Sequence, residues 1–548
     1  MTGCPAPETQ KDGGGNPGSD AASSDAAYQD SANADAGSPD MMVGDSSTTA
    51  DATTADVVVT DGRLPDTATA DTATGDVTAA DVASVDVAAA DVTSADVAAA
   101  DAATPDSASL DAGTGTEDAA TGIIRVLDTD SQGSGMDTNA RMIALGNKVV
   151  FQGPAQSIWV SDGTEQGTVV LIDQNINLET WTVFNDTLYI IQSGYPWPSY
   201  YLWETDGTPG GTSNQGLLQY GGANLDLNGT FLVAGTSRLY VEGSTAAEGG
   251  ELFRFGLPLS NVEIVLNDTP GTDSTNVNLP YLYSGKLLME IFNTTVNGYG
   301  AYDIAGGSVE MLTFDFGGGS HSPAPSVVFE YGSKLWVCDE GCVTTDGTQA
   351  VTALALANTQ TNEVFMVEDN QVITANGSIF FRGTQYDSSM HVVVEHEIFK
   401  SDGTFAGTSL LIDLNDTGHG NPREFLGGDQ HFVFLADVGS TPGEMWISDG
   451  TLAGTYMVAE ANPGPTSSNI QSKAIIGDKV IFHANDGVTG NELFEYDISA
   501  KVTTLIEDKN PGAASLDPKT FVVAGNCLFF RGTVAGYGSE LCVYCPLL

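Results

Sequence analysis

The feature that most constrains the fold is a repeat of about 47 residues that fills residues 122–548. Each copy contains a turn led by Gly or Asn and then an apolar strand, as in residues 146–151 and 525–530. A second apolar element follows, as in residues 397–399, and a third ends in an acidic residue, as in residues 411–413. With a short strand ahead of each turn, every copy supplies four strands, which is the pattern of one blade of a β-propeller.

We count nine copies and therefore predict an all-β fold, a β-propeller of about eight to nine four-stranded blades. The two ends of the repeat region indicate how the ring closes. Residues 123–128 have the pattern of a fourth strand although they precede the first complete copy, and the chain ends just after a third strand at residues 543–544. A strand from the N-terminal side would complete the last blade and hide its edge. We expect residues 122–548 to form one closed domain.

Residues 1–121 differ sharply in composition from the repeat region. They contain no Trp or Phe, and 23 acidic residues stand against Lys11 and Arg63. From Asp51 to Asp111 an Asp recurs at every fifth position. This spacing spreads the carboxylates around a helix and over both faces of a strand, so neither form gains an apolar face. We expect a disordered acidic tether, in preference to a pentapeptide-repeat solenoid whose inward positions would be filled by Val.

The residues Thr2-Gly3-Cys4 resemble the end of a bacterial lipobox, in which the cysteine becomes lipidated. The apolar segment that precedes a lipobox is not in this sequence, and the alternative is a cysteine that lies there by chance. A long tether follows at once, as in surface lipoproteins, which favours lipidation of Cys4. We therefore expect an extracytoplasmic protein of the bacterial outer membrane, cell surface or periplasm.

The charge of the chain restricts its partners. The formal net charge is −54, from 18 Lys and Arg against 72 Asp and Glu. Binding to phosphates needs a basic surface, so nucleic acid is excluded as a partner. No run of eighteen apolar residues occurs, so we expect contact with a membrane only through a lipid anchor.

Four copies carry the motif Asp-Gly-Thr-x-x-Gly-Thr directly after the third strand, at residues 162–168, 206–212, 402–408 and 449–455. On this motif the chain resembles the ELWxxDGT repeat proteins of bacteria. The resemblance covers the repeat region and does not include residues 1–121. It implies an extracytoplasmic, propeller-like domain.

We expect this motif to form a structural turn rather than a cation site. In such a turn Asp accepts backbone N–H bonds, Gly takes a positive φ, and Thr caps the returning strand. A further Asp-Gly-Thr, at residues 346–348, is expected in an inserted loop ahead of a third strand near residues 353–357. The residues assigned to structural turns are Asp162, Gly163, Thr164, Asp206, Gly207, Asp402, Gly403, Asp449 and Gly450.

The most ligand-like segment is the run Tyr-Pro-Trp-Pro-Ser-Tyr-Tyr at residues 195–201, a loop between second and third strands. Its prolines limit the freedom of flat aromatic rings, which suits stacking on sugars or contact with a protein. We take Tyr195, Trp197 and Tyr200 as the candidate ligand-binding residues. The alternative is that Trp197 and Tyr200 cover a neighbouring blade.

Oxygen-rich loops join the fourth strand of one copy to the next, and loops of this kind could hold Ca²⁺. None has the spacing of an EF-hand, and Asn-Pro-Gly forms a good turn without metal. We expect no other cofactor. The candidate metal ligands are Asp268, Asp413, Asp416 and Glu507.

The cysteines fit an oxidising compartment. Cys338 and Cys342 could close a small loop, while Cys527, Cys542 and Cys545 lie together in the last copy, where one pair could secure the closure of the ring. The disulfide candidates are Cys338, Cys342, Cys527 and Cys542. One of the five cysteines beyond residue 121 must stay unpaired.

Patterns that indicate catalysis are few. The segment 391–397 lacks zinc-protease spacing, and no nucleophile-elbow or phosphate-binding motif occurs, so we take no residue as catalytic. The sequence favours a monomeric cell-envelope protein for binding or adhesion, which recognises carbohydrate or protein through the loop-rich face of the propeller. The alternatives are a hydrolase that acts on an envelope polymer, with acids and histidines meeting near the central channel, and a purely structural envelope component.

Overall fold

The computed structural model describes residues 122–548 apart from short gaps, and the expected tether and Cys4 lie outside the described residues. The gaps are residues 130–133, 138, 228–232, 235–237, 267–270, 272–273, 293–296, 313–326, 339–340, 349–354, 359, 416–417, 429, 440, 459–460 and 463–467. None of the helices described in this range is long and apolar enough to cross a membrane.

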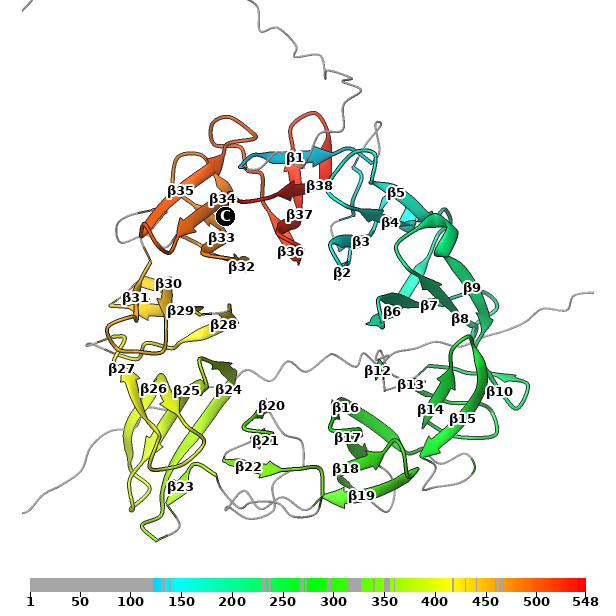
Figure 1. Ribbon diagram of the computed structural model, residues 1–548, viewed down its shortest axis with the longest axis horizontal. Coiled ribbons are helices and arrows are strands. Elements are labelled where there is room, and N and C mark those ends of the chain that lie inside the picture. Colours follow the sequence, from blue (N-terminus) through cyan, green and yellow to red (C-terminus); the bar gives the residue numbers. More distant parts are fainter. Residues whose placement is uncertain are drawn as a thin grey trace, which may run out of the picture. The chain divides into compact units, whose positions relative to one another are not determined.

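The prediction of an all-β propeller is confirmed. Nine larger antiparallel sheets of the described residues follow one another along the chain, and we number them as blades 1 to 9, while a tenth sheet has only two strands (Figure 1). Within a blade, consecutive strands pair with each other, and the first long strand lies innermost in the ring, which in the sixth blade is β24 (Glu363–Ala375) (Figure 1).

Blades 1 to 4 are each built from four strands. They are β2–β5 (Met142–Leu145, Lys148–Gln152, Ile158–Ser161, Val169–Ile172), β6–β9 (Asn177–Phe184, Thr187–Ser193, Tyr200–Thr205, Ser213–Leu217), β12–β15 (Val233–Ala234, Arg238–Gly243, Glu251–Gly256, Ser260–Leu266) and β16–β19 (Asn276–Tyr283, Lys286–Phe292, Asn297–Asp303, Ser308–Leu312). Between blades 2 and 3 in the chain, β10 (Gln219–Tyr220) and β11 (Ala223–Asn224) form a small hairpin, and two 3-10 turns are η1 (Pro154–Gln156) and η2 (Pro209–Gly211).

Blades 5 to 9 are more varied. They are β20–β22 (Val327–Tyr331, Lys334–Cys338, Cys342–Thr345), β23–β27 (Ala357–Asn358, Glu363–Ala375, Ser378–Tyr386, Val392–Ser401, Ser409–Ile412), β28–β31 (Arg423–Gly427, Phe432–Val438, Thr441–Ser448, Tyr456–Met457), β32–β35 (Lys473–Ile476, Lys479–Asn485, Asn491–Asp497, Val502–Glu507) and β36–β38 (Lys519–Ala524, Cys527–Val534, Gly538–Tyr544) completed by β1 (Ile124–Leu127).

The second strand of a blade is apolar on both faces because both faces are covered. In β3, Val150 packs toward blade 2, whereas Val149 and Phe151 pack toward blade 9. All three side chains are fully buried. The buried apolar residues of the described chain form nine such clusters, and each cluster joins two neighbouring blades. The nine interfaces together close the ring.

The strand β1 completes blade 9. It pairs antiparallel with β38, with Ile124 opposite Tyr544 and Leu127 opposite Leu541 (Figure 1). Blade 8 also holds this strand, because the carboxylate of Glu507 accepts a hydrogen bond from the Ile124 N–H at 3.2 Å. Without β1 the outer edge of β38 would be open to other strands.

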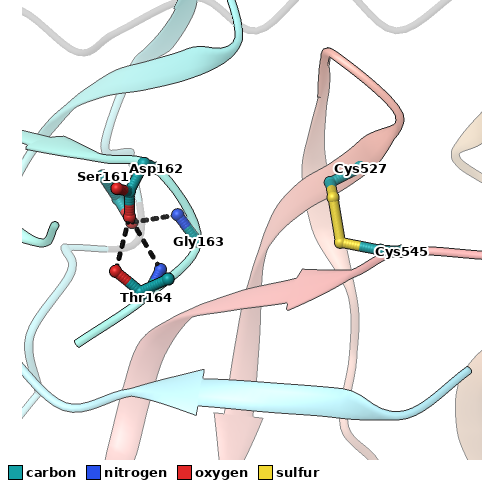
Figure 2. Close-up of a disulfide and its surroundings, with 6 residues drawn as sticks. All are labelled: Ser161, Asp162, Gly163, Thr164, Cys527 and Cys545. Carbon is teal, nitrogen blue, oxygen red and sulfur yellow. Dashed lines mark hydrogen bonds between the residues drawn. A yellow bond between two sulfur atoms is a disulfide. The ribbon is translucent and has the colours of Figure 1, made fainter. Parts of the chain in front are cut away.

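The disulfides differ in part from the expected set. Cys338 is joined to Cys342, and Cys527 is joined to Cys545 rather than to Cys542, whose thiol is free and buried. The strand register explains this result. Leu528 lies opposite Tyr544, so their outer neighbours Cys527 and Cys545 meet at the end of the hairpin (Figure 2). Cys542 lies inside the strand and packs in the apolar cluster between blades 8 and 9.

The expected position of the third strand in blade 5 is wrong. That strand is β22, Cys342–Thr345, which lies ahead of Asp346 and not near residues 353–357. The Cys338–Cys342 disulfide makes the turn between β21 and β22 very short, so the third strand begins at once. Asp346 therefore occupies the ordinary turn position, where its carboxylate accepts the Thr348 N–H at 3.0 Å. In the described residues this sheet has three strands.

The Asp-Gly-Thr motif forms the same turn in all four copies. In blade 1, Asp162 Oδ1 accepts hydrogen bonds from the Thr164 N–H at 2.9 Å and the Thr164 hydroxyl at 2.7 Å, and Ser161 Oγ accepts the Gly163 N–H (Figure 2). The Thr164 Oγ1 in turn accepts the Gly167 N–H. A single carboxylate therefore organises the complete hairpin.

The first glycine of the motif also contacts the preceding blade. Gly163 has a φ of 89°, and a Cβ on it would meet Phe529 and Val543 of blade 9 at 3.5 and 3.4 Å. A Cβ on the corresponding Gly450 would meet Phe380 Cζ of blade 6 at 2.6 Å. The turn thus joins neighbouring blades in addition to reversing the chain.

The second glycine of the motif lies against the Asp carboxylate, which leaves no room for a side chain. Blade 2 allows a test of this, because a second glycine without such a contact stands next to it in the sequence. A Cβ on Gly211 would lie 2.1 Å from Asp206 Oδ1, whereas a Cβ on the adjacent Gly210 has no atom within 4 Å. We expect Gly211→Ala to lower the free energy of unfolding by about 1–3 kcal/mol, as for other overpacked sites. Gly210→Ala should leave it nearly unchanged. Urea denaturation of both variants measures the difference, and equal stabilities would contradict this account of the motif.

Candidate functional site

The antiparallel order of the strands gives the ring two different faces. Hairpins between second and third strands emerge on the same face as the crossovers that lead from a fourth strand to the next blade. The Asp-Gly-Thr turns emerge on the opposite face. We call the first of these the loop-rich face. It carries the long connections of the propeller, which are the usual place for binding residues.

An aromatic loop stands on this face between β7 and β8. The Tyr195 side chain is 94% exposed and that of Trp197 is 67% exposed. The base of the loop is held by the Gly194 N–H, which donates to the Ser199 carbonyl at 2.7 Å, and by the Ser199 hydroxyl, which donates to the Pro196 carbonyl at 2.5 Å. The peptide bonds before Pro196 and Pro198 are cis. The two exposed rings therefore project from a loop that its own hydrogen bonds hold in place.

Tyr200 does not share this exposure. Its side chain is buried in the apolar cluster between blades 2 and 3, with Leu202 and Leu239. Burial raises the pKa of Tyr200, and a hydrogen bond with the Trp197 side chain acts in the opposite direction. Tyr200 is thus a supporting residue for Trp197 rather than a direct ligand contact. The alternative that an aromatic residue of this loop covers a neighbouring blade therefore describes Tyr200. Direct contact of Tyr195 and Trp197 with a ligand stays a prediction.

The loop is also braced by the hairpin that follows blade 2. The side-chain amide of Asn224, on β11, donates to the Pro198 carbonyl at 2.9 Å and to Ser199 Oγ at 3.3 Å. Asn224 therefore makes both of these hydrogen bonds between the hairpin and the aromatic loop. The support therefore comes from two separate parts of the chain.

The crossovers on the loop-rich face are held by buried glutamates of the third strands. The Glu397 carboxylate accepts the Gly420 N–H at 2.6 Å and the Leu414 N–H at 3.0 Å, both from the crossover that leaves blade 6. Glu540 accepts the Gly135 N–H at 2.8 Å in the same way. These residues are the Glu of the Glu-Leu-Trp type element. The repetition of Glu at this position was visible in the sequence, but its burial was not.

A buried carboxylate has a cost, which appears in the pKa of these residues. Burial raises the pKa of Glu492 to about 7, although the Leu516 N–H donates to one of its oxygens at 2.8 Å. Burial also raises the pKa of Glu397, and its two backbone hydrogen bonds lower it. The more complete the set of donors, the better the charged form is stabilised.

Of the candidate calcium ligands, only Asp413 and Glu507 belong to the part of the chain that the structure describes. Asp268 and Asp416 lie outside the described residues. Asp413 Oδ1 accepts the Asn415 N–H at 3.2 Å, while Glu507 binds β1 and pairs with Lys509 at 2.8 Å. Within the part of the chain that the structure describes, no three His, Cys, Asp or Glu side chains are grouped as metal ligands would be.

The structure brings together a polar cluster in blade 6 that the sequence analysis missed. His396 Nδ1 lies 2.6 Å from Glu368 Oε2, and Arg382 Nε lies 3.2 Å from the same oxygen. The rings of His396 and His419 meet edge to face with centroids 5.1 Å apart, and His419 Nε2 lies 3.3 Å from Glu395. The cluster combines the innermost long strand β24, strands β25 and β26, and the crossover toward blade 7.

His396 has an unusual backbone conformation. Its φ is +56°, in the left-handed region, and it immediately precedes the buried Glu397. The equivalent residue before Glu444 is Gly443, with a φ of +75°. A non-glycine residue in this region is strained, and such residues gather at functional sites. The pairing of β25 with β26 is irregular here, with register shifts around Gln385, and such a bulge changes which side chains share a face.

No protein-family model matches this chain, and no curated protein matches it. Several solved structures do. The WD40 domain of SCAP from fission yeast is 10% identical with a TM-score of 0.37, and the match covers 77% of this chain and 97% of that domain. Puromycin hydrolase is 12% identical with a TM-score of 0.33, and the match covers 75% of this chain and 61% of that one.

A third solved structure is the extracellular domain of a putative one component system from B. thetaiotaomicron. It is 10% identical with a TM-score of 0.23, and the match covers 74% of this chain and 70% of that one. At such similarities the comparison concerns the fold alone, which the sheet topology already establishes.

The pKa of Glu492 leads to a test by pH. Folding favours the protonated form of Glu492, because its pKa is about 7 in the folded protein and near 4.5 in the unfolded chain. The resulting stabilisation is complete at a pH below 4.5 and is lost as the pH rises through about 7. Gln keeps an acceptor for the Leu516 N–H without a charge. We expect Glu492→Gln to match the parent protein at pH 5 and to exceed its free energy of unfolding at pH 8 by up to about 3 kcal/mol.

Glu397→Gln is the matched control for that measurement. Both Glu397 oxygens accept backbone N–H groups, so an amide would place a donor against a donor. We expect this variant to be less stable than the parent at both pH values. Urea denaturation at pH 5 and pH 8 checks both expectations, and a Glu492→Gln difference that does not grow with pH would contradict the role assigned to burial.

Proposed function

We propose that this protein is a binding or adhesion protein of the cell envelope, which recognises a carbohydrate or protein through the loop-rich face of its propeller. The observation that carries the proposal is the pair of exposed rings, Tyr195 and Trp197, on a loop held by Ser199 and Asn224. Exposure of two aromatic rings to water is unfavourable in the free protein. Binding removes this apolar surface from water when the rings contact the flat face of a sugar or an apolar side chain.

The setting of this loop supports the same function. The rest of the ring gives each blade a buried interface, so a ligand is expected to meet a surface of fixed shape. The acidic segment 1–121 and the lipobox-like Cys4 fit a ring displayed at a distance from a membrane, and the resemblance to ELWxxDGT repeat proteins fits an extracytoplasmic location. We propose a monomer on the bacterial surface or in the periplasm, with Ca²⁺ as the one cofactor to test.

A second candidate function rests on the blade 6 cluster. A hydrolase that acts on an envelope polymer would need acids and histidines that meet near the central channel, and the contact of His396 with Glu368 on the long strand β24 supports this candidate. In this function Glu368 would hold the His396 ring, and the other ring nitrogen would take a proton from a water molecule. Thr384 donates to the other Glu368 oxygen, which fixes this carboxylate.

The binding function predicts a clear effect of Trp197. We expect Trp197→Ala and Tyr195→Ala each to weaken binding in a glycan and envelope-protein screen by about tenfold or more. The melting temperature should stay that of the parent, because both side chains are exposed. Tyr537→Ala is the control, since Tyr537 is also partly exposed and lies in the equivalent loop of blade 9. Unchanged binding in both aromatic-loop variants would favour a purely structural envelope component.

The hydrolase candidate predicts an effect of His396 instead. Envelope polysaccharides and peptidoglycan would be incubated with the parent, with His396→Gln and with the control His391→Gln, whose side chain is 79% exposed and pairs with Asp387. We expect release of reducing ends or peptides by the parent and the control, and a loss of about a hundredfold or more in His396→Gln. No release by the parent, or equal release by all three, removes this candidate.

A further inference from the structure

A polar pocket opens on the loop-rich face between blades 1 and 2. Its volume is about 450 Å³, which falls within the range of small-molecule sites. Its walls come from the crossover that enters β2, from the hairpin between β3 and β4, and from the start of β6. The lining residues are Asp137, Asn139, Ala140, Arg141, Gln152, Gln156 and Leu178.

One wall of the pocket belongs to blade 2, the blade that carries the aromatic loop. Leu178 in its wall is paired with Gln192 across β6 and β7, and Asn177 is paired with Ser193. The chain then passes through Gly194 to Tyr195, three residues beyond Gln192, which is at most about 10 Å of extended strand. With the step of about 5 Å between paired strands, the backbone of Tyr195 is at most about 15 Å from that of Leu178, a span that a ligand of a few sugar rings can cover.

The polar groups of the pocket offer donors and acceptors in similar measure. Gln152 Oε1 accepts the Arg141 N–H at 3.2 Å, and this leaves its amide nitrogen to donate. Arg141 Nη1 donates to the Glu179 carbonyl at 2.8 Å, which leaves further N–H donors on the same guanidinium. Asn139 and Gln156 are exposed amides that both donate and accept. Sugar hydroxyls also do both, so this lining is complementary to a polyhydroxylated ligand.

The charges favour a neutral glycan over an acidic one. Asp137 and Arg141 contribute one charge of each sign to the pocket. The protein carries a net charge of −54, so an acidic polymer would be repelled over a long range. A protein partner is less well matched, because the fully buried centre of a protein interface is apolar and this pocket is mostly polar.

We propose that the pocket binds one ring of a neutral oligosaccharide while Tyr195 and Trp197 stack on the rings that follow. This inference rests on the proposed binding function and names its ligand class. The pocket fixes one sugar by hydrogen bonds, and the loop adds affinity for longer chains. The two parts of the site therefore predict different dependences on ligand length.

The test measures binding by calorimetry for neutral gluco-, manno- and chito-oligosaccharides of one to six rings, with hyaluronan fragments as the acidic probe. For the neutral series that the parent binds, we expect the double variant Asn139→Ala/Gln156→Ala to lose about tenfold or more in affinity at every length. Trp197→Ala should lose affinity only for chains of two or more rings. Gln360→Ala, an exposed glutamine in blade 6, is the control and should bind as the parent does.

The outcomes separate this inference from the proposed function. If Trp197→Ala weakens binding and the double variant does not, the pocket is overturned and the binding function stands. If hyaluronan binds better than the neutral series, the ligand class is overturned. If no oligosaccharide binds but Trp197→Ala loses an envelope protein in pull-down, the glycan pocket is overturned and binding is to protein. If neither variant changes any binding, both proposals fail.

Discussion

The ring depends on one constraint, that each blade has two apolar faces and neither can be left in water. Phe380 packs toward blade 7 while its neighbours Ile379 and Phe381 pack toward blade 5, so one strand supplies both interfaces. An open stack of such sheets would expose one apolar face at each end and cannot be stable alone. Closing the stack removes both ends. The nine apolar clusters are therefore a single arrangement in which no blade is terminal.

The same requirement explains where the polar residues of the repeat lie. The buried glutamates hold the crossovers on one face, and the Asp-Gly-Thr turns fix the hairpins on the other. Both use a carboxylate to satisfy backbone N–H groups that strands leave behind at their ends. Because these positions recur around the ring, they shape the protein without distinguishing one blade from another. Function is expected where a blade departs from the pattern, as in the loop of blade 2 and at His396 of blade 6.

Most of the fold could be predicted from the sequence because apolar runs and turn residues are local signals. The turns at Asp162 and Asp449 follow from the motif alone. The site was harder to predict. Tyr200 is buried because blade 3 covers it, and the sequence of one blade does not contain its neighbour. His396 acquires its partners through a bulge, which shifts the alternation of side chains. The pocket is assembled from a crossover, a hairpin and the start of β6, so no spacing in the sequence indicates it.

The completion of blade 9 by β1 has a mechanical consequence. The chain enters the ring through Ile124–Leu127, and these four residues are paired along the outer edge of β38. When a ligand is held fixed and the chain is pulled from its N-terminal side, tension reaches β1 before any other strand of the ring. Glu507 and the interface around Ile124 then share that load with the β1–β38 hydrogen bonds. The strand that closes the ring is thus also the first to carry the load, and its detachment would open the edge of β38 while the chain stays joined to the ring through β2.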